Sequence, residues 1–230
     1  MQRRGLSQEM LKAIACVTML IDHIGAVFIP GYALRIIGRI SFPIFCFLLA
    51  EGVRHTRHPG KYALRLAMGG LLAEIPFDLL FYGRVNWQHQ NVMVTLLIGL
   101  LTVLGMKKLG RFQLAAVVPG CILAELLGGD YGGFGVALIS VFALAADQKW
   151  RNTVGFLGMA VIFWAMDSVR VPVLGLRIPI QMFGLLSMIP IRCYTGKKAT
   201  LSRHVQGVFY AFYPVHLLLL LLVEKLMFPR

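Results

Sequence analysis

Apolar residues run in long blocks along the chain, and short polar stretches separate the blocks. A membrane-spanning helix needs about 20 residues, within a range of roughly 17 to 25, and several blocks reach that length. The pattern predicts an all-α, polytopic transmembrane helical bundle of about nine spans, with eight to ten as the range, in a single domain over 1–230. The predicted spans are Leu11 to Ile29, Ala33 to Val53, Lys61 to Tyr82, Val92 to Met106, Phe112 to Leu127, Phe134 to Ala146, Thr153 to Val169, Ile178 to Ile191 and Val205 to Met227.

Composition agrees with this class, because 58% of the residues are hydrophobic and only 14% are charged. A mean hydropathy of +0.74 excludes an ordinary soluble domain of 230 residues. The formal net charge is +13, yet no basic run alternates with aromatic residues, so we expect no nucleic-acid partner. The four cysteines lack paired spacing, which argues against a metal site or a disulfide framework. We expect a multi-pass membrane protein.

The basic residues predict the orientation, because lysine and arginine accumulate in cytoplasmic loops. With the N-terminus in the cytoplasm, every predicted inner segment is basic and the C-terminus lies outside. Of the 23 basic residues, the inner segments hold Arg3, Arg4, Lys12, Arg54, Arg57, Lys61, Arg65, Lys107, Lys108, Arg111, Lys149, Arg151, Arg192, Lys197, Lys198 and Arg203.

Several ionisable side chains lie inside the apolar blocks, where each costs about 2.5 to 3.5 kcal/mol at a helix centre unless it is paired or hydrated. They comprise Asp22, His23, Arg35, Arg39, Glu51, Glu74, Asp78 and His216, with His89 in the following outer loop. Asp22 and His23 are adjacent, so they point about 100° apart on a helix. Both are satisfied only if polar partners surround this helix, which predicts a polar cavity within the bundle.

Two further spacings connect these side chains. Glu74 and Asp78 are four residues apart, hence on one helix face, and are predicted to meet Arg39. A packing ion pair is an equally good interpretation of that meeting, as a packing histidine is for His216. Lys12 precedes His23 by eleven residues, roughly 16 Å along one helix. An extended ligand with an anionic head and a reactive tip, such as an acyl-CoA, has this shape.

The segments "LKAIACVTMLIDHIGAVF", "LRIIGRISFPIFCFLLAEGVRHT", "KYALRLAMGGLLAEIPFDLLFYG" and "HQNVMVTLLIGLL" closely resemble the TraX family of membrane proteins. Later "GDYGGFGVALI", "IQMFGLLSMIPIRCYTGK" and "FYAFYPVHLLLL" resemble it too, so the likeness runs from about Leu11 to Leu220. The founding member is similar in role to an acetyltransferase that modifies the terminal amine of conjugative pilin. The family also resembles broader transmembrane acyltransferases, which carry a basic residue, ten intervening residues and a catalytic histidine on the first helix.

The resemblance implies an acyl-CoA-dependent O- or N-acetyltransferase of the bacterial cytoplasmic membrane, with acetyl-CoA as its donor substrate and no metal. His23 is the implied catalytic residue, as base or acyl carrier. Our own hypothesis adds Asp22 or Glu51 as its orienting acid, and Arg39, held by Glu74 and Asp78, as the oxyanion partner. The implied donor-binding residues are Lys12 and a second basic pair, either Arg54 and Arg57 or Lys61 and Arg65. Topology marking with contact to anionic membrane lipid is the alternative interpretation of that basic loop. Candidates on the acceptor side are His89, Asp130 and His216. The chain departs from the acyltransferases by its shorter length and by "LAEG" in place of a Ser-Gly-Phe-type signature.

The acceptor stays open between a pilin N-terminus, a surface glycan, a peptide and a lipid. Two other functions remain alternatives. One is a transporter or flippase that uses Asp22, His23, Glu74 and Asp78 as a pathway, although no inverted repeat is evident. The other is a scaffold for the assembly of a surface structure, in which the polar side chains only pack the helices.

Overall fold

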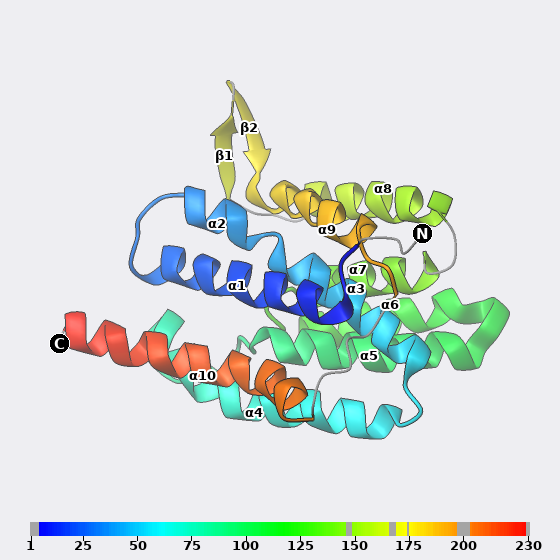
Figure 1. Cartoon of the computed structure of the whole chain (residues 1–230), viewed down its shortest axis with the longest axis horizontal. Helices are drawn as coiled ribbons and strands as arrows, with labels where there is room; N and C mark the ends of the chain where they lie inside the picture. The colour runs from blue at the N-terminus through cyan, green and yellow to red at the C-terminus, as the bar shows by residue number, and fades with distance from the viewer. Residues whose placement is uncertain (1–4, 146–148, 166–168, 174, 197–202, 229–230) are drawn as a thin grey trace. The chain divides into compact units, whose positions relative to one another are not determined.

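A computed structural model describes residues 5–145, 149–165, 169–173, 175–196 and 203–228 (Figure 1). This part of the chain is almost entirely helical, which confirms the all-α prediction. The elements are α1 (Gln8–Val27), α2 (Ala33–Gly38), α3 (Ser41–His55), α4 (Pro59–Tyr82), α5 (Val92–Leu109), η1 (Gly110–Ala116), α6 (Val117–Leu126), α7 (Gly132–Leu144), α8 (Lys149–Ala165), β1 (Arg170–Val173), β2 (Leu176–Pro179), η2 (Ile180–Ser187), α9 (Met188–Arg192) and α10 (Arg203–Met227).

The chain forms two compact units. The first comprises Met1–Leu48 and Ala145–Phe209, and the second comprises Leu49–Leu144 and Tyr210–Arg230. The helices α3 and α10 each contribute residues to both units. The prediction of a single domain stays a prediction, and the two units are described one at a time below.

In the first unit, α1 begins at an N-cap, where Ser7 Oγ accepts a hydrogen bond from the Met10 amide at 3.3 Å. The backbone just before α1 pairs with the chain that follows α9. The Leu6 amide donates to the Cys193 carbonyl at 2.8 Å, and the Thr195 amide donates to the Leu6 carbonyl at 3.1 Å. Residues almost 190 positions apart are thus joined at the start of the first helix.

The predicted span from Ala33 to Val53 is interrupted between α2 and α3. Pro43 lacks the amide hydrogen that a continuous helix would donate to the Arg39 carbonyl. The same residue is tolerated in the first turn of a new helix, where such a hydrogen bond is not made. Ser41 begins α3 and its Oγ donates to the Ala15 carbonyl of α1 at 2.9 Å. The helices α2 and α3 therefore contact α1 separately, α3 through the hydrogen bond of Ser41.

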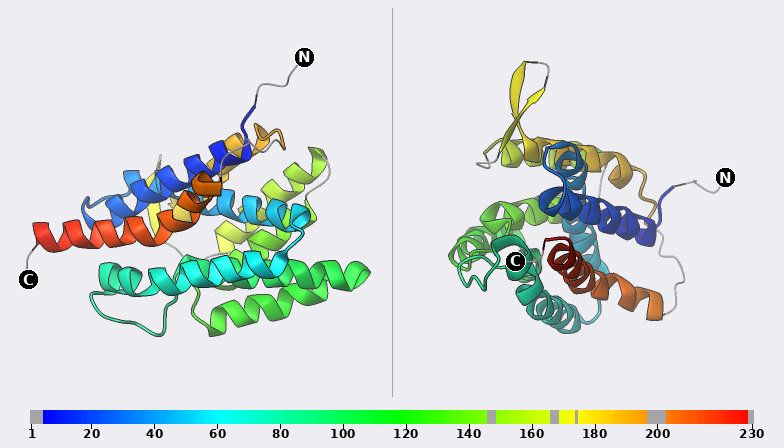
Figure 2. Two further views of the ribbon diagram at one scale, coloured as in Figure 1. Left: turned by 60° about the horizontal axis from the view of Figure 1, so that its bottom comes forward. Right: turned by 90° about the vertical axis from the view of Figure 1, so that its left-hand side faces the viewer.

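A β-hairpin in the first unit is a feature that the sequence analysis did not predict. β1 pairs with β2 in antiparallel register, with Val171 opposite Ile178. Both Figure 1 and Figure 2 show it extending away from α8 and η2. The predicted helical span from Ile178 to Ile191 is confirmed only from Ile180 onward, because its first two residues belong to β2 and the apolar helix consists of the 3-10 helix η2 followed by α9.

The second unit centres on three helices, α5, α6 and α7, whose buried contacts include Ile98, Ala124 and Val136. Small residues let these helices approach closely. A Cβ at Gly99 would overlap Ile139, and one at Gly120 would overlap Thr102. The chain reverses from α5 to α6 through Gly110, which has a positive φ of 52°.

In the second unit, hydrogen bonds link residues near the two ends of α5 to other segments of the unit. At one end, Lys107 Nζ donates to the Val53 carbonyl at 2.7 Å. At the other end, the Gln90 amide donates to the Gly128 carbonyl at 2.8 Å. Gly128 has a positive φ of 65°, and a Cβ there would overlap the Gln88 carbonyl oxygen.

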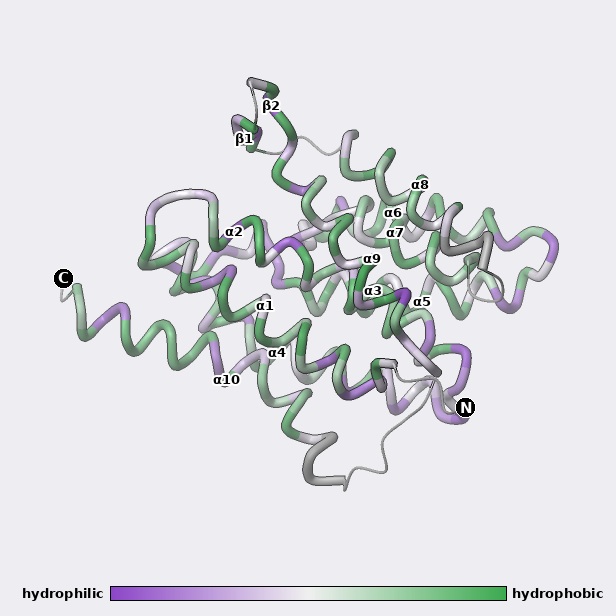
Figure 3. The backbone as a smooth tube through the Cα atoms, turned by 45° about the horizontal axis from the view of Figure 1, so that its top comes forward, coloured by the Kyte–Doolittle hydropathy of each residue, from purple (hydrophilic) through white to green (hydrophobic). Residues whose placement is uncertain are grey.

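Within the described residues, four helical segments are long and apolar enough to cross a membrane: Gln8–Val27, Ala33–His55, Val92–Leu126 and Gly207–Met227. The second contains the break between α2 and α3, and the third contains the reversal between α5 and α6. Shorter apolar helices cover Gly132–Leu144, Thr153–Ala165 and Ile180–Arg192. Figure 3 shows hydrophobic colour along most helical segments, with hydrophilic colour concentrated at turns and helix ends. A multi-pass membrane protein follows from this, whereas the count of nine spans stays a prediction. Arg3, Arg4, Lys197 and Lys198, which that topology uses, lie outside the described residues.

The Gly128 contact predicts a stability difference between two glycines that both have positive φ. Gly128→Ala adds a Cβ against a backbone carbonyl, which cannot move aside like a side chain. Gly83→Ala meets nothing within 4 Å but carries a similar φ of 68°, so it isolates the backbone strain of roughly 1–2 kcal/mol. We expect Gly128→Ala to lower the melting temperature in detergent clearly more than Gly83→Ala. Equal melting temperatures would contradict the loop contact.

Candidate functional site

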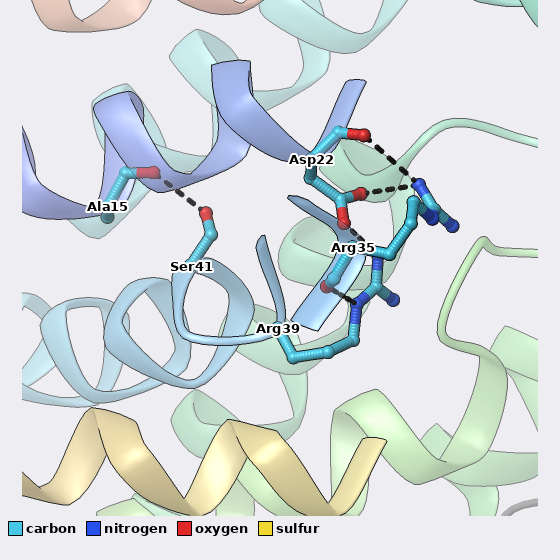
Figure 4. A network of polar contacts seen from close by, with 5 residues as sticks. All are labelled: Ala15, Asp22, Arg35, Arg39 and Ser41. Carbon is cyan, nitrogen blue, oxygen red and sulfur yellow. Dashed lines mark hydrogen bonds and ion pairs between the residues drawn. The ribbon is translucent and has the colours of Figure 1, made fainter. Parts of the chain in front are cut away.

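Asp22 is the centre of a buried ion cluster in the first unit (Figure 4). Its residue surface is only 7% exposed, and each carboxylate oxygen is paired with an arginine. Arg35 Nη1 donates to Oδ2 at 2.7 Å, and Arg39 Nη2 donates to Oδ1 at 2.5 Å. Arg39 Nε also donates to the Arg35 carbonyl at 3.2 Å, which fixes the direction of the guanidinium.

The local sequence explains how two arginines reach one carboxylate. Arg35 and Arg39 are four residues apart, so both project from the same side of α2 and its C-terminal end. Gly38 lies against Asp22, and a Cβ at this position would overlap the carboxylate. Two guanidinium groups face one carboxylate, so the cluster carries one formal positive charge in excess.

Two parts of the predicted site differ in the structure. Arg39 was predicted to pair with Glu74 or Asp78, but its acid is Asp22. The packing of α2 against α1 brings the arginine to Asp22, and the sequence pattern does not reveal which helices pack together. Asp22 was also a predicted orienting acid for His23. Its two oxygens are instead engaged by Arg35 and Arg39.

His23 and Lys12, the two residues of the acyltransferase-like spacing, both lie on α1 and are half-buried. His23 follows Asp22 directly, so the ion cluster is fixed one residue away from the imidazole in the sequence. Lys12 Nζ lies 5.4 Å from the centre of the Phe209 ring, a cation–π distance. The spacing of one basic residue and one imidazole along a single helix is therefore real, since α1 is continuous from Gln8 to Val27.

The other predicted orienting acid, Glu51, forms its ion pairs with residues of its own helix, α3. Its carboxylate pairs with Arg54 Nη1 at 3.3 Å and with the His55 imidazole at 3.0 Å. The remaining predicted donor-binding residues, Arg57, Lys61 and Arg65, are exposed on the turn before α4 and on its first turns. Arg65 also lies over the Tyr210 ring, 5.6 Å from its centre.

Glu74 and Asp78 lie on α4 of the second unit and accept hydrogen bonds from the loop that leads to α5. The Asn91 amide donates to Glu74 Oε2 at 3.3 Å, and Asn91 Nδ2 donates to the same oxygen. The Asn86 amide donates to Asp78 Oδ2 at 2.7 Å. The prediction that both acids lie on one helix face agrees with this arrangement, because one loop contacts both.

The three candidates on the acceptor side all belong to the second unit. His89 is exposed and stacks on Tyr82, with ring centres 5.6 Å apart. Asp130 is exposed in the turn between α6 and α7. His216 is buried, its Nδ1 lies 2.8 Å from the Phe212 carbonyl oxygen, and its ring stacks on Phe212 at 4.8 Å. These contacts favour the packing interpretation of His216.

Asn91 is a residue that the sequence analysis missed. It is fully buried, it caps α5 by accepting from the Met93 amide at 2.9 Å, and it donates to the Gly70 carbonyl at 2.9 Å. Asparagine directly before an apolar run is a typical helix-start signal, so "QNVMVTLLIGLL" contained the cue. Arg35 was named among the intramembrane ionisable residues but was given no role, although its spacing from Arg39 places both on one face.

The profile of the TraX protein family matches residues 7–224 of the chain. A curated relative from Dichelobacter nodosus, named probable fimbrial assembly protein FimC of serogroup H1, is 29% identical over 227 residues. That match covers 91% of this chain and 92% of the relative. An uncharacterized protein of Rickettsia prowazekii (strain Madrid E), RP591, is 31% identical over 99 residues, which is 43% of this chain and 37% of that protein. No solved structure matches the chain significantly.

The ion cluster predicts that Asp22→Asn is strongly destabilising. The substitution leaves Arg39, which is only 7% exposed, without its carboxylate, and breaking a buried pair costs about 3–5 kcal/mol. Glu51→Gln is the matched control, because the Arg54 side chain of that pair is 29% exposed and such pairs contribute at most about 1 kcal/mol. Thermal unfolding in detergent measures both. A loss for Asp22→Asn no larger than that for Glu51→Gln would refute the cluster's role.

Proposed function

Because the chain belongs to the TraX family, we propose that it is a membrane-embedded acyltransferase. It transfers an acetyl group from cytoplasmic acetyl-CoA to an amine or hydroxyl at the membrane or its outer face. The observation that supports this most is the buried Asp22 cluster, which fixes an excess positive charge next to His23 in the sequence. The name of the Dichelobacter nodosus relative further supports an acceptor in fimbrial or another surface-structure assembly.

In the proposed reaction, the His23 imidazole takes a proton from the acceptor amine or hydroxyl. At the same time, the nitrogen or oxygen of the acceptor attacks the thioester carbonyl carbon. Negative charge develops on the carbonyl oxygen, and Arg39, fixed by Asp22, is the group assigned to stabilise it. The carbon–sulfur bond then breaks, and the imidazolium returns the proton to the departing thiolate. The products are the acetylated acceptor and coenzyme A. In the variant route, His23 first carries the acetyl group as an acyl-imidazole.

The donor substrate fits the distribution of basic residues. Lys12 lies eleven residues before His23 on the continuous helix α1, roughly 16 Å along its axis. Coenzyme A has phosphates at one end and its thioester at the other, so Lys12 is assigned to a phosphate and His23 to the thioester. Arg54, Arg57, Lys61 and Arg65 are assigned to the remaining anionic groups of the nucleotide.

We also propose nine crossings of the bacterial cytoplasmic membrane, with the N-terminus inside. Three contacts within the units join segments that this proposal places on the same side of the membrane. Leu6 bonds to Cys193, and Lys107 bonds to Val53, so two pairs of predicted inner segments each meet. Gln90 bonds to Gly128, which joins two predicted outer loops. If one span were added or removed between the two segments of a pair, these segments would lie on opposite sides of the membrane and could not be bonded.

The orientation predicts the reactivity of two thiols. Cys193 is exposed at a predicted inner turn, and Trp87 is exposed in a predicted outer loop, so Trp87→Cys introduces an outer thiol. A membrane-impermeant maleimide should label position 87 of Trp87→Cys/Cys193→Ser in intact cells. It should label Cys193 of the otherwise unchanged chain only after the membrane is permeabilised. Labelling of Cys193 in intact cells would invalidate the proposed orientation.

The catalytic scheme predicts that two substitutions on α1 separate donor binding from transfer. His23→Ala should keep the rise in melting temperature that acetyl-CoA produces in purified protein, because the phosphate contacts remain. It should lose transfer of label from acetyl-CoA to membrane components by at least ~100-fold. Lys12→Ala should lose both the thermal shift and most of the transfer. A ligand that binds only the folded state stabilises it by about 2.7 kcal/mol at 100 times its Kd.

Lys108→Ala is the control for this experiment, because Lys108 is an exposed lysine on another predicted inner segment and has no assigned role. Retained transfer in His23→Ala would sink the acyltransfer scheme. Absence of any acetyl-CoA shift in the unchanged protein would favour the scaffold alternative, which the relative's name fits equally well. In that case the Asp22 cluster would serve helix packing alone.

A further inference from the structure

Glu74 and Asp78 share an unusual state in the second unit. Each carboxylate has one oxygen that accepts amide hydrogens from the loop before α5, and a second oxygen, Glu74 Oε1 or Asp78 Oδ1, that is buried without a hydrogen-bond partner. Asp78 is only 1% exposed. A buried, unpaired carboxylate oxygen is expensive, and native structures rarely contain one without a ligand or a proton to satisfy it.

The loop holds the two carboxyl groups in place. Asn91 donates to Glu74 Oε2 from both its backbone and its side chain, and the same side chain is itself fixed by Gly70 and Met93. The Asn86 amide holds Asp78 Oδ2 at 2.7 Å. Rotating either carboxyl to satisfy its second oxygen would break these bonds, so the unpaired oxygens belong to the folded arrangement.

The charges around the pair do not compensate it. The two acids are one helical turn apart on α4, close enough for mutual repulsion. In the part of the chain that the structure describes, no lysine, arginine or histidine forms an ion pair with either carboxylate. Titratable groups that interact electrostatically nearby are Tyr82 on α4, Asp130 on the turn before α7 and Tyr213 on α10, and His89 stacks on Tyr82. None of them supplies a fixed positive charge.

We propose that Glu74 Oε1 and Asp78 Oδ1 together bind one small monovalent cation, either a proton or Na⁺. A proton and Na⁺ would each place one positive charge between the two carboxylate oxygens. The burial of both atoms excludes a bulky organic cation. A divalent metal is disfavoured, because no group of three His, Cys, Asp or Glu side chains occurs among the described residues. This site is independent of the acyl transfer proposed above.

The bound cation has a structural consequence. With one positive charge between them, the two carboxyl groups no longer repel each other, and both can keep the loop amides of Asn86 and Asn91. The same Asn91 caps α5, so occupancy of the site stabilises the start of that helix. The bound cation thus stabilises the contact between α4 and the start of α5.

Reaction with dicyclohexylcarbodiimide tests the site, because this apolar reagent modifies protonated carboxyl groups within a membrane. The full chain is reconstituted in vesicles and labelled over a range of pH, with either NaCl or choline chloride at constant ionic strength. Mass spectrometry locates the adduct. A proton site gives an adduct on Glu74 or Asp78 that falls about tenfold per pH unit above its midpoint and is the same in both salts. A Na⁺ site gives an adduct that NaCl suppresses and choline chloride does not.

Thermal unfolding provides the second measurement, since it does not require the reagent to reach the site. Na⁺ or lower pH should raise the melting temperature of the unchanged protein relative to Asp78→Asn, because the ligand binds only the folded chain. Glu125→Gln is the matched control, because Glu125 is exposed and bonded to the Gly133 amide, and it should respond like the unchanged protein. If Asp78→Asn does not fold, Glu74→Gln takes its place.

The outcomes of the two measurements are distinct. A labelled carboxyl, or a thermal response that Asp78→Asn loses and Glu125→Gln keeps, supports the site. The cation proposal is overturned if neither carboxyl is labelled at any pH and the thermal responses of all variants are alike. Because neither measurement uses acetyl-CoA, failure here leaves the acyltransfer proposal unaffected.

Discussion

The first unit depends on the cost of burying Asp22 within an apolar helix. An ionised carboxylate there is tolerated only when opposite charges approach it closely, and two arginines do so from one side of α2. Three local features make this approach geometrically achievable: Gly38, which has no Cβ to obstruct the carboxylate, the break before α3, and the hydrogen bond from Ser41 to Ala15. The packing of α2 against α1 therefore depends on this one buried charge.

The second unit meets the same physical problem in a different way. Glu74 and Asp78 are stabilised by amide donors from a loop, which satisfy one oxygen of each carboxylate and bring no charge. Amide hydrogen bonds orient an anion but do not neutralise it, so the two acids keep no compensating charge from this loop. This contrast is why the two groups of acids are assigned different roles, the first next to a reactive imidazole and the second as a cation site.

Much of the architecture was readable from the chain. The hydropathy blocks predicted helices in nearly every place where the structure has them, because the length and apolarity of a membrane helix follow from the bilayer itself. The misses occur where local chemistry overrides hydropathy. Pro43 lies at the break in one predicted span, and the strands Arg170–Val173 and Leu176–Pro179 pair beside η2. An apolar run alone does not distinguish an α-helix from a strand followed by a 3-10 helix.

For the candidate site too, some features follow from the sequence and others only from the tertiary structure. The sequence alone determined that Asp22, His23, Arg39, Glu74 and Asp78 had to be satisfied inside a membrane bundle, because each is costly in lipid wherever it points. It also determined that Lys12 and His23 share one helix. Which acid meets which arginine was decided only by tertiary structure. Ion pairing depends on distances of a few ångströms, and the packing of α2 against α1 brings Arg39 to Asp22 on α1 instead of the expected acids on α4.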